Sequence, residues 1–370
     1  MQKVNNNQKV DKLLLFAIIT ILIVGIVTLS SASTVASFKN KGNNYFYLLK
    51  QLLYGVLPGL IFMYFVSRID YHSWQKFAPL LILIGIVLLI LVLVPSIGFK
   101  VSGARRWIDL KLFTFQPAEF LKLAVIFYLA SWYDKRQQQA HDLYYGFLPS
   151  LAIVGLIAGL ILMQPDMGTM LVLSAVAAVM IFIGGAKIKY LLSVGGIGLV
   201  MFWILIKADP ERMSRITTFF DRHADPKGIS YQVMQALIAI GSGGWWGLGL
   251  GQSRQKFDYL PESIGDSIFA IMAEEMGFVR VLIFLGLFVL LAYKGYRLAM
   301  KTEDNFGKLV ATGITSWIII QAMINIGGIT STIPLTGVPL PFVSYGSTAM
   351  VMNLCAMGVL LNISRQTNTG

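Results

Sequence analysis

The stretch LLLFAIITILIVGIVTLSSA, residues 13–32, decides the fold of this chain. It contains no charged residue, and its length matches the ~20 apolar residues that an α-helix needs to cross a bilayer. Lipid accepts a segment only when its backbone polar groups are satisfied internally, as they are in a helix. The run is longer than the core of a cleavable signal, about 7 to 15 residues, so we expect a retained transmembrane helix.

Nine further apolar runs follow the first, in a chain of 370 residues that is 56% hydrophobic and only 13% charged. These proportions exclude an ordinary soluble domain. We therefore predict an all-α polytopic membrane protein with ten transmembrane helices, forming one membrane domain over residues 1–370. The ten runs are residues 13–32, 46–66, 78–97, 118–132, 146–163, 167–184, 190–206, 267–293, 309–333 and 347–363.

The distribution of Lys and Arg predicts the orientation of these helices. Ten crossings place both termini on one side, and with the N-terminus inside, each short hydrophilic inner connection carries at least two basic residues. The outer links 164–166 and 334–346 carry none. The total number of basic residues is equal on the two sides. Half of the outer ones lie in the long loop 207–266, however, and long loops have little influence on the orientation of the helices. We expect cytoplasmic tails at 1–12 and 364–370, and an extracytoplasmic loop at 207–266 between the seventh and eighth helices.

Several ionisable residues lie at membrane depth, where a charge is costly unless it is paired or functional. Glu119 and Lys122 are three residues apart, which suits an ion pair on one helix face or a role near a substrate. Asp166, in a Pro and Gly turn, suits a helix cap as well as a functional role. Glu274 and Glu275 lie inside the eighth run, and pairing across helices is the simpler interpretation, with Lys122 or Arg280 as partners.

Asp266 lies just before the eighth run, at the end of a polar stretch, GQSRQKFDYLPESIGD, at 251–266. A carboxylate at a membrane edge is partly desolvated, which raises its pKa and makes it a better proton acceptor. An ordinary helix N-cap is the alternative. The Gly-rich segment 241–251 lacks the Gly-Lys-Ser/Thr ending of a nucleotide loop and, with Trp245 and Trp246, favours a segment on the membrane surface, entered through a short amphipathic helix at 231–240.

The remaining candidates concern an anionic ligand. Outer basic residues beside a cavity suit a phosphate or diphosphate, although attraction to lipid headgroups explains them equally well. We nominate Arg105, Arg106, Lys122, Arg254 and Lys256 for a diphosphate. Ser344 and Tyr345, in a proline-broken segment before the last helix, are assigned to the substrate cleft, although a purely structural break explains the segment equally well. The three histidines are scattered and Cys355 is the single cysteine, so the sequence contains no metal-binding cluster and no disulfide.

The polar stretch and several other motifs resemble the SEDS family (shape, elongation, division and sporulation), whose members include FtsW, RodA and SpoVE. The matching segments include GARRWI at 103–108, QPAE at 116–119, QPDMGT at 164–169, AEEMG at 273–277 and GVPLPFVSYG at 337–346. The sequences of residues 253–257 and 361–365 are more similar to those of the division and sporulation members than to that of RodA. The sequence departs from the family pattern at Gly265 and Ser267, at Arg280 and at Ser347.

The resemblance implies a peptidoglycan glycosyltransferase of the bacterial cytoplasmic membrane. Its substrate would be lipid II, an undecaprenyl-diphosphate-linked disaccharide peptide, and its partner a class B penicillin-binding protein, with no role for nucleic acid. Asp266 and Glu262 would correspond to the family's functional carboxylates. Asp266 is then a general base or a ligand of a divalent cation, Mg²⁺ or Mn²⁺. Two other functions remain open: a flippase for a lipid-linked precursor, and a division scaffold without chemistry.

Overall fold

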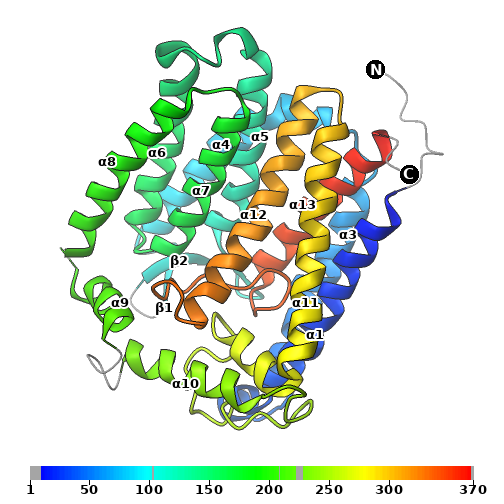
Figure 1. The fold of residues 1–370 in the computed structure, drawn as a ribbon, viewed down its shortest axis with the longest axis vertical. Coiled ribbons are helices and arrows are strands. Elements are labelled where there is room, and N and C mark those ends of the chain that lie inside the picture. The colour runs from blue at the N-terminus through cyan, green and yellow to red at the C-terminus, as the bar shows by residue number, and fades with distance from the viewer. Residues whose placement is uncertain (1–9, 102–103, 208, 222–227, 368–370) are drawn as a thin grey trace.

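The structure is a computed structural model that describes residues 10–101, 104–207, 209–221 and 228–367. The chain is mainly helical (Figure 1). The α-helices are α1 (Lys12–Lys41), α2 (Phe46–Gln51), α3 (Leu57–Val66), α4 (His72–Leu93), α5 (Pro117–Lys135), α6 (Leu148–Leu162), α7 (Met167–Ile183), α8 (Ile188–Lys207), α9 (Pro210–Phe220), α10 (Ile229–Ser242), α11 (Ile268–Lys301), α12 (Asn305–Ile329) and α13 (Ser347–Gln366).

Each of the ten predicted apolar runs coincides with a helix. The second is α2 and α3 joined by a π-helical turn at Leu52–Val56, and the fifth is a similar turn at Leu143–Phe147 continued by α6. Among the described residues, eight helical segments are long and apolar enough to cross a membrane, and α7 is a shorter apolar helix. The fold class is confirmed, while the number of ten crossings stays a prediction.

The two ends of the described chain lie together at one end of the molecule. The backbone N–H of Asp11 donates to Ser364 Oγ at 3.0 Å, and Lys294 Nζ lies 2.8 Å from Asp11 Oδ2. The loop segments with α9 and α10 lie at the opposite end (Figure 1). This arrangement agrees with an even number of crossings. Which end faces the cytoplasm stays a prediction.

A small antiparallel sheet at the loop end was not predicted. It comprises β1 (Gly98–Val101), β2 (Ala104–Asp109) and β3 (Thr114–Phe115), with β2 in the middle. Gly98 pairs with Ile108, and Ile108 pairs with Phe115. Its strands are too short for a clear alternation of apolar and polar residues, and this is why the sequence pattern did not reveal them.

The interior of the molecule is built around α12 and α13. In the apolar 18-residue stretch of each of these helices 72% of the residues are buried, whereas in the corresponding stretch of α8 none is. Polar side chains of α12, including Gln321 and Asn325, are buried as well. Because buried polar groups need partners, α12 determines where neighbouring segments can lie.

Helix α11 is broken near its beginning. Gly277 has φ 75° and ψ 172°, a conformation that glycine adopts without the steric penalty of a side chain. Residues 244–249 cross the break: Leu248 and Gly249 donate to the carbonyls of Glu274 and Glu275. Phe278 N–H in turn donates to Gly244 O. The backbone groups freed by the break are thus satisfied, as a non-helical segment at membrane depth requires.

Candidate functional site at the start of α11

Asp266 lies two residues before α11 and is partly buried. Its Oδ1 accepts a hydrogen bond from Gln232 Nε2 of α10 at 3.2 Å and one from Ser267 Oγ at 3.4 Å. Gln232 also donates to Ser267 Oγ at 2.9 Å. The other oxygen, Oδ2, faces Gly337, where an added Cβ would lie 3.7 Å away. The N-cap residue of α11 is Ser267, which makes no side-chain capping bond, so Asp266 is not an ordinary N-cap.

The backbone around Asp266 is held from two sides. Asn325 Nδ2 of α12 donates to Asp266 O at 2.8 Å and to Val338 O at 2.7 Å. Ser344 Oγ donates to Gly265 O at 2.7 Å, and Tyr345 N–H donates to the carbonyl of residue 264 at 2.9 Å. The segment before α13 therefore fixes the turn that carries Asp266. Ser344 and Tyr345 were predicted to line the substrate cleft; their contacts place them in the support of Asp266, and a substrate contact stays a prediction.

The surroundings of Asp266 change its acidity. Burial raises the pKa of this carboxyl, the nearby carboxylate of Glu262 raises it further, and Arg215 opposes both, giving a pKa of about 7. Glu262 itself is exposed and has φ 51° in the turn after Pro261. A carboxyl with a pKa near neutrality exchanges protons readily at physiological pH, which suits a general base.

A pocket of about 190 Å³ lies beside Asp266 and is lined by three arginines. Arg106 comes from β2, and Arg212 and Arg215 come from α9. Gly337 connects the two features, because it lines this pocket and also lies next to Asp266 Oδ2. Arg215 Nη1 would lie 3.8 Å from a Cβ at Gly337. The pocket is thus cationic and borders the aspartate.

Two carboxylates balance part of this positive charge. Arg106 Nε lies 3.9 Å from Asp166 Oδ2, and its guanidinium donates to the carbonyls of Gln164 and Pro165. Asp166 also caps α7, accepting from Thr169 N–H at 3.1 Å. The capping interpretation of Asp166 is confirmed. Asp166 and Asp209 both line the pocket, and Arg212 Nε lies 2.9 Å from Asp209 Oδ2.

Arg105, predicted together with Arg106, lies at the next position of β2. The pairing of β1 with β2 shifts register between Phe99 and Lys100, so the side chains of Arg105 and Arg106 do not follow a regular alternation. Ala104 and Arg106 line the arginine pocket, and Arg105 is absent from its described lining residues. The structure therefore brings Arg106 to the candidate site, and the predicted role of Arg105 in binding a diphosphate stays a prediction.

Glu274 and Glu275 hold the preceding loop in place. Glu274 accepts from Ser253 Oγ at 2.5 Å and from Arg254 N–H at 3.0 Å. Glu275 accepts from Ser253 N–H at 3.1 Å and forms an ion pair with Lys256 at 3.2 Å. The predicted pairing with Lys122 or Arg280 is wrong. It failed because the break in α11 brings residues 251–256 against the two carboxylates.

The basic residues of this loop differ in exposure. Lys256 is buried, and besides Glu275 its ammonium group contacts Gly251 O at 2.7 Å and Ser31 Oγ at 3.1 Å. Arg254 has an exposed side chain. Neither residue is among those that line the arginine pocket, so their predicted role in binding a diphosphate stays a prediction.

Glu119 and Lys122 form the predicted ion pair, at 2.8 Å, in the interior. Lys122 Nζ also donates to Gln321 Oε1 at 2.8 Å and lies 4.9 Å from the ring centroid of Trp317. Gln321 Nε2 donates to Pro339 O at 3.0 Å. The pair is therefore connected to the segment that supports Asp266, and its ammonium group is enclosed by protein.

Four residues near Asp266 were missed by the sequence analysis: Gln232, Arg212, Arg215 and Asn325. The arginines were counted only as charges of a long loop, and the polar face of α10 was attributed to the membrane surface. The helix predicted at 231–240 is confirmed as part of α10. Asn325 had a visible signal, an amide inside an apolar run four residues after Gln321, on the same helix face.

The residues described do not include a group of three or more His, Cys, Asp or Glu side chains that could hold a metal ion. Asp266 and Glu262 nevertheless provide two neighbouring carboxylates. Mg²⁺ is commonly bound by one or two protein carboxylates together with substrate phosphates. The donor set therefore fits a cation that binds with a phosphorylated ligand.

Fold and site together define the class of protein: an integral membrane protein of many helices, with a polar site where α11 begins. The chain belongs to the FtsW/RodA/SpoVE family of cell cycle proteins, whose family model matches residues 11–369. It is 43% identical over 355 residues to stage V sporulation protein E of Bacillus subtilis, covering 96% of this chain and 97% of that protein. It is 39% identical to a probable peptidoglycan glycosyltransferase FtsW of Trichlorobacter lovleyi, covering 96% and 93%.

Two solved structures share the fold. One is a chain from a peptidoglycan synthase complex studied for the coordination of polymerization and crosslinking, with a TM-score of 0.79 and 26% identity, covering 98% of this chain and 99% of that one. The other is the rod shape determining protein RodA of Thermus thermophilus, with a TM-score of 0.70 and 26% identity, covering 98% of both chains. The resemblance drawn from the motifs is thus confirmed.

Proposed function

We propose that this chain is a peptidoglycan glycosyltransferase that polymerises lipid II into glycan strands at the outer face of the cytoplasmic membrane. The observation that carries the proposal is Asp266, a carboxyl with a pKa of about 7 that borders a pocket lined by three arginines. Relatives that are named probable peptidoglycan glycosyltransferase FtsW support it across 96% of the chain. Identity to both sporulation and division proteins favours a role in building septa.

The reaction needs a base at the attacking hydroxyl. The 4-hydroxyl of an acceptor sugar attacks the anomeric carbon of the donor, and the bond from that carbon to the lipid diphosphate breaks. Asp266 accepts the hydroxyl proton through Oδ2, while Gln232 and Ser267 hold Oδ1. A direct displacement of this kind inverts the anomeric configuration, as in carboxylate-assisted glycosidases. Glu262 supports the base by keeping the pKa of Asp266 high.

The leaving diphosphate needs positive charge, and Arg106, Arg212 and Arg215 provide it. Guanidinium groups bind phosphate oxygens with paired hydrogen bonds, and fixed charges aimed at developing negative charge lower the barrier. A Mg²⁺ or Mn²⁺ ion held by Asp266, Glu262 and the diphosphate would add to this neutralisation. The arginines and the aspartate meet at Gly337, so one site provides the base for the attacking hydroxyl and the positive charge for the leaving diphosphate.

The proposed partner is a class B penicillin-binding protein that crosslinks the new strand. Support comes from the solved peptidoglycan synthase complex, one chain of which has the same fold. In the proposed orientation both termini are cytoplasmic, and the Asp266 site faces outward, where the strand grows.

The test is polymerisation of lipid II by the purified full-length protein with its transpeptidase partner, measured by gel separation of glycan strands. Asp266→Asn is expected to lower the rate at least about 10²-fold, because a positioned base contributes that much or more. Arg215→Gln is expected to lower the rate about 10²-fold, because it removes a positive charge that stabilises the leaving diphosphate. Asp109→Asn, at an exposed position of β2, is the matched control and should polymerise normally.

Three outcomes separate the alternatives. Normal strands from Asp266→Asn would overturn the base assignment. Loss of lipid translocation in vesicles without loss of polymerisation would favour a flippase, and no effect on either would favour a scaffold. A chelator that stops the native protein, with activity restored by Mg²⁺ or Mn²⁺, would establish the cation.

A further inference from the structure

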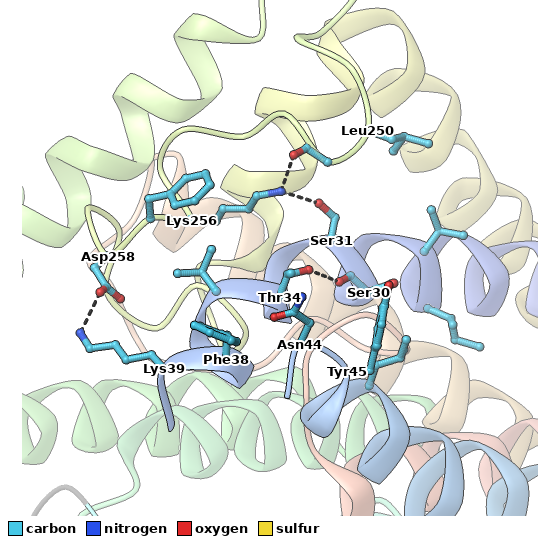
Figure 2. Close-up of a pocket in the computed structure, with 16 residues that line it drawn as sticks. Ser30, Ser31, Thr34, Phe38, Lys39, Asn44, Tyr45, Leu250, Lys256 and Asp258 are labelled. Carbon is cyan, nitrogen blue, oxygen red and sulfur yellow. Dashed lines mark hydrogen bonds and ion pairs between the residues drawn. The ribbon is translucent and has the colours of Figure 1, made fainter. Parts of the chain in front are cut away.

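A second and larger cavity lies away from the arginine pocket. It is a groove of about 1000 Å³ between α1, α2 and residues 250–258 (Figure 2). It shares none of its described lining residues with the arginine pocket. The proposed reaction does not use it, so its function needs a separate explanation.

Among the residues of α1 that line the groove, the one charged residue lies at one end. Ile26 and Val27 line the end that lies deeper along the helix, Ser30 and Thr34 follow, and Lys39 lines the other end. Thirteen residues of helix separate Ile26 from Lys39, which corresponds to about 20 Å. One leaflet of a bilayer, with its hydrocarbon and its headgroup layer, is also about 20 Å thick. The groove therefore matches a single-leaflet amphiphile in length and in polarity.

The floor of the groove is polar but already satisfied. The buried ammonium group of Lys256 contacts Ser31, Gly251 and Glu275. Figure 2 shows Lys256 reaching Ser31 and the backbone of the loop. A charged ligand would therefore interact with the charged side chains at the mouth of the groove and not with Lys256.

The mouth is crossed by one exposed ion pair. Lys39 Nζ lies 2.7 Å from Asp258 Oδ2, and their side chains are 65% and 56% exposed (Figure 2). An exposed pair of this kind contributes little to stability, so a competing anion can separate it. Outside the described lining residues, the ammonium groups of Lys41 and Lys50 lie 5.6 and 5.9 Å from the ring centroid of Phe46, which follows the lining residue Tyr45. Lys39 and Asp258 balance each other at the mouth, and Lys41 and Lys50, beyond the lining residues, make the surrounding surface cationic.

We propose that this groove binds one anionic phospholipid of the leaflet that meets the Lys41 end of α1. The phosphate lies at Lys39, with Asn44 and Thr34 as neutral hydrogen-bonding groups, and an acyl chain lies along Val27 and Ile26. A phospholipid fits better than a long prenyl chain, because the groove spans one leaflet and a longer chain would extend beyond it.

Such a lipid would stabilise a segment that leads to Asp266. Residues 250–258 form one wall of the groove, and Glu274 and Glu275 join the same segment to α11. A bound lipid that contacts Phe257 and Leu250 would therefore order the loop from its membrane side. The proposal depends only on the membrane location of the chain, and it stands or falls independently of the glycosyltransferase.

The test is native mass spectrometry of the purified full-length protein in detergent, titrated with phosphatidylglycerol. Phosphatidylcholine tests whether binding depends on an anionic headgroup. Undecaprenyl phosphate tests whether the groove prefers a prenyl chain to acyl chains. We expect one phosphatidylglycerol to bind in preference to phosphatidylcholine. Lys39→Gln should weaken its binding about fivefold, the value of one basic residue near an anionic surface. Asp258→Asn should strengthen it by a similar factor, because it frees Lys39.

Lys187→Gln, at an exposed position just before α8, is the matched control and should bind as the native protein does. Thr34→Phe, which fills the groove, should abolish the bound lipid, and a melting curve of each variant checks its folding. Equal binding of the two phospholipids, or no response to Lys39→Gln and Asp258→Asn, would overturn the proposal. Preference for undecaprenyl phosphate would overturn the choice of phospholipid and identify a prenyl occupant.

Discussion

At the scale of single residues, the acidity of Asp266 sets the expected pH dependence. A general base must be ionised, so the polymerisation rate should rise as pH increases through about 7, the pKa of Asp266. Gln232 donates to the carboxylate and so favours its ionised form. Gln232→Leu removes this bond, which should raise the pKa and move the rising limb of the pH–rate profile upward by about one unit.

The measurement is the initial polymerisation rate from pH 5.5 to 9 for the native protein and the variant. Gln252→Leu is the control, because Gln252 is an exposed glutamine of the same loop region. A purely structural role of Gln232 would lower the rate equally at every pH. A limb that stays in place would contradict the assignment of Gln232 as a residue that positions Asp266.

The same scale shows what the sequence could predict about the site. Asp266 was identified because it follows helix-disfavouring residues at the edge of an apolar run, and Glu262 was identified from the resemblance to the family. Arg212 and Arg215 were not, because no local pattern tells which face of α9 turns toward Asp266. The position of Lys256 was also unpredictable, since its ion pair with Glu275 depends on a loop that folds back over the break in α11.

At the scale of elements, the break in α11 should be essential. A Cβ at Gly277 would lie 2.1 Å from the backbone nitrogen of Gly247, and the positive φ is unfavourable for any other residue. Gly277→Ala should destabilise the fold by at least about 2 kcal/mol, through the clash and the backbone strain together. A lower melting temperature in detergent, with reduced polymerisation, is the expected result.

Gly286→Ala in the same helix is the matched control. A Cβ there meets no atom within 4 Å, and alanine favours helix more than glycine does. This variant should be as stable as the native protein, or more so. Equal melting temperatures for Gly277→Ala and the native protein would show that the crossing of residues 244–249 over the break tolerates rearrangement.

Elements differed in how far the sequence revealed them. Apolar runs of bilayer length predicted all ten helical segments, because the membrane imposes one length and one composition on each. The break at Gly277 was not predicted, because a single glycine is tolerated inside a helical pattern and does not by itself mark a break. The sheet of β1, β2 and β3 was missed because its longest strand, ARRWID at Ala104–Asp109, shows no regular alternation of apolar and polar residues.

At the scale of the whole molecule, the separation of the termini from the loops leads to a prediction about orientation. The basic residues of the short connections predict that the termini are cytoplasmic. In a Cys355→Ala background, Leu112→Cys, at an exposed position next to the sheet, should react with a membrane-impermeant maleimide in intact spheroplasts. Gln138→Cys, exposed between α5 and α6, should react only after the membrane is permeabilised.

The two positions test the same orientation, because Leu112 is expected outside and Gln138 inside. The label reaches only the outer surface while the membrane is sealed. If Gln138→Cys reacted first, the molecule would be inverted and Asp266 would face the cytoplasm. A base on that side could not act on a strand that grows outside, so the proposed reaction would fail with the orientation. Agreement of both positions would place the arginine pocket, and the diphosphate it is proposed to bind, at the outer surface.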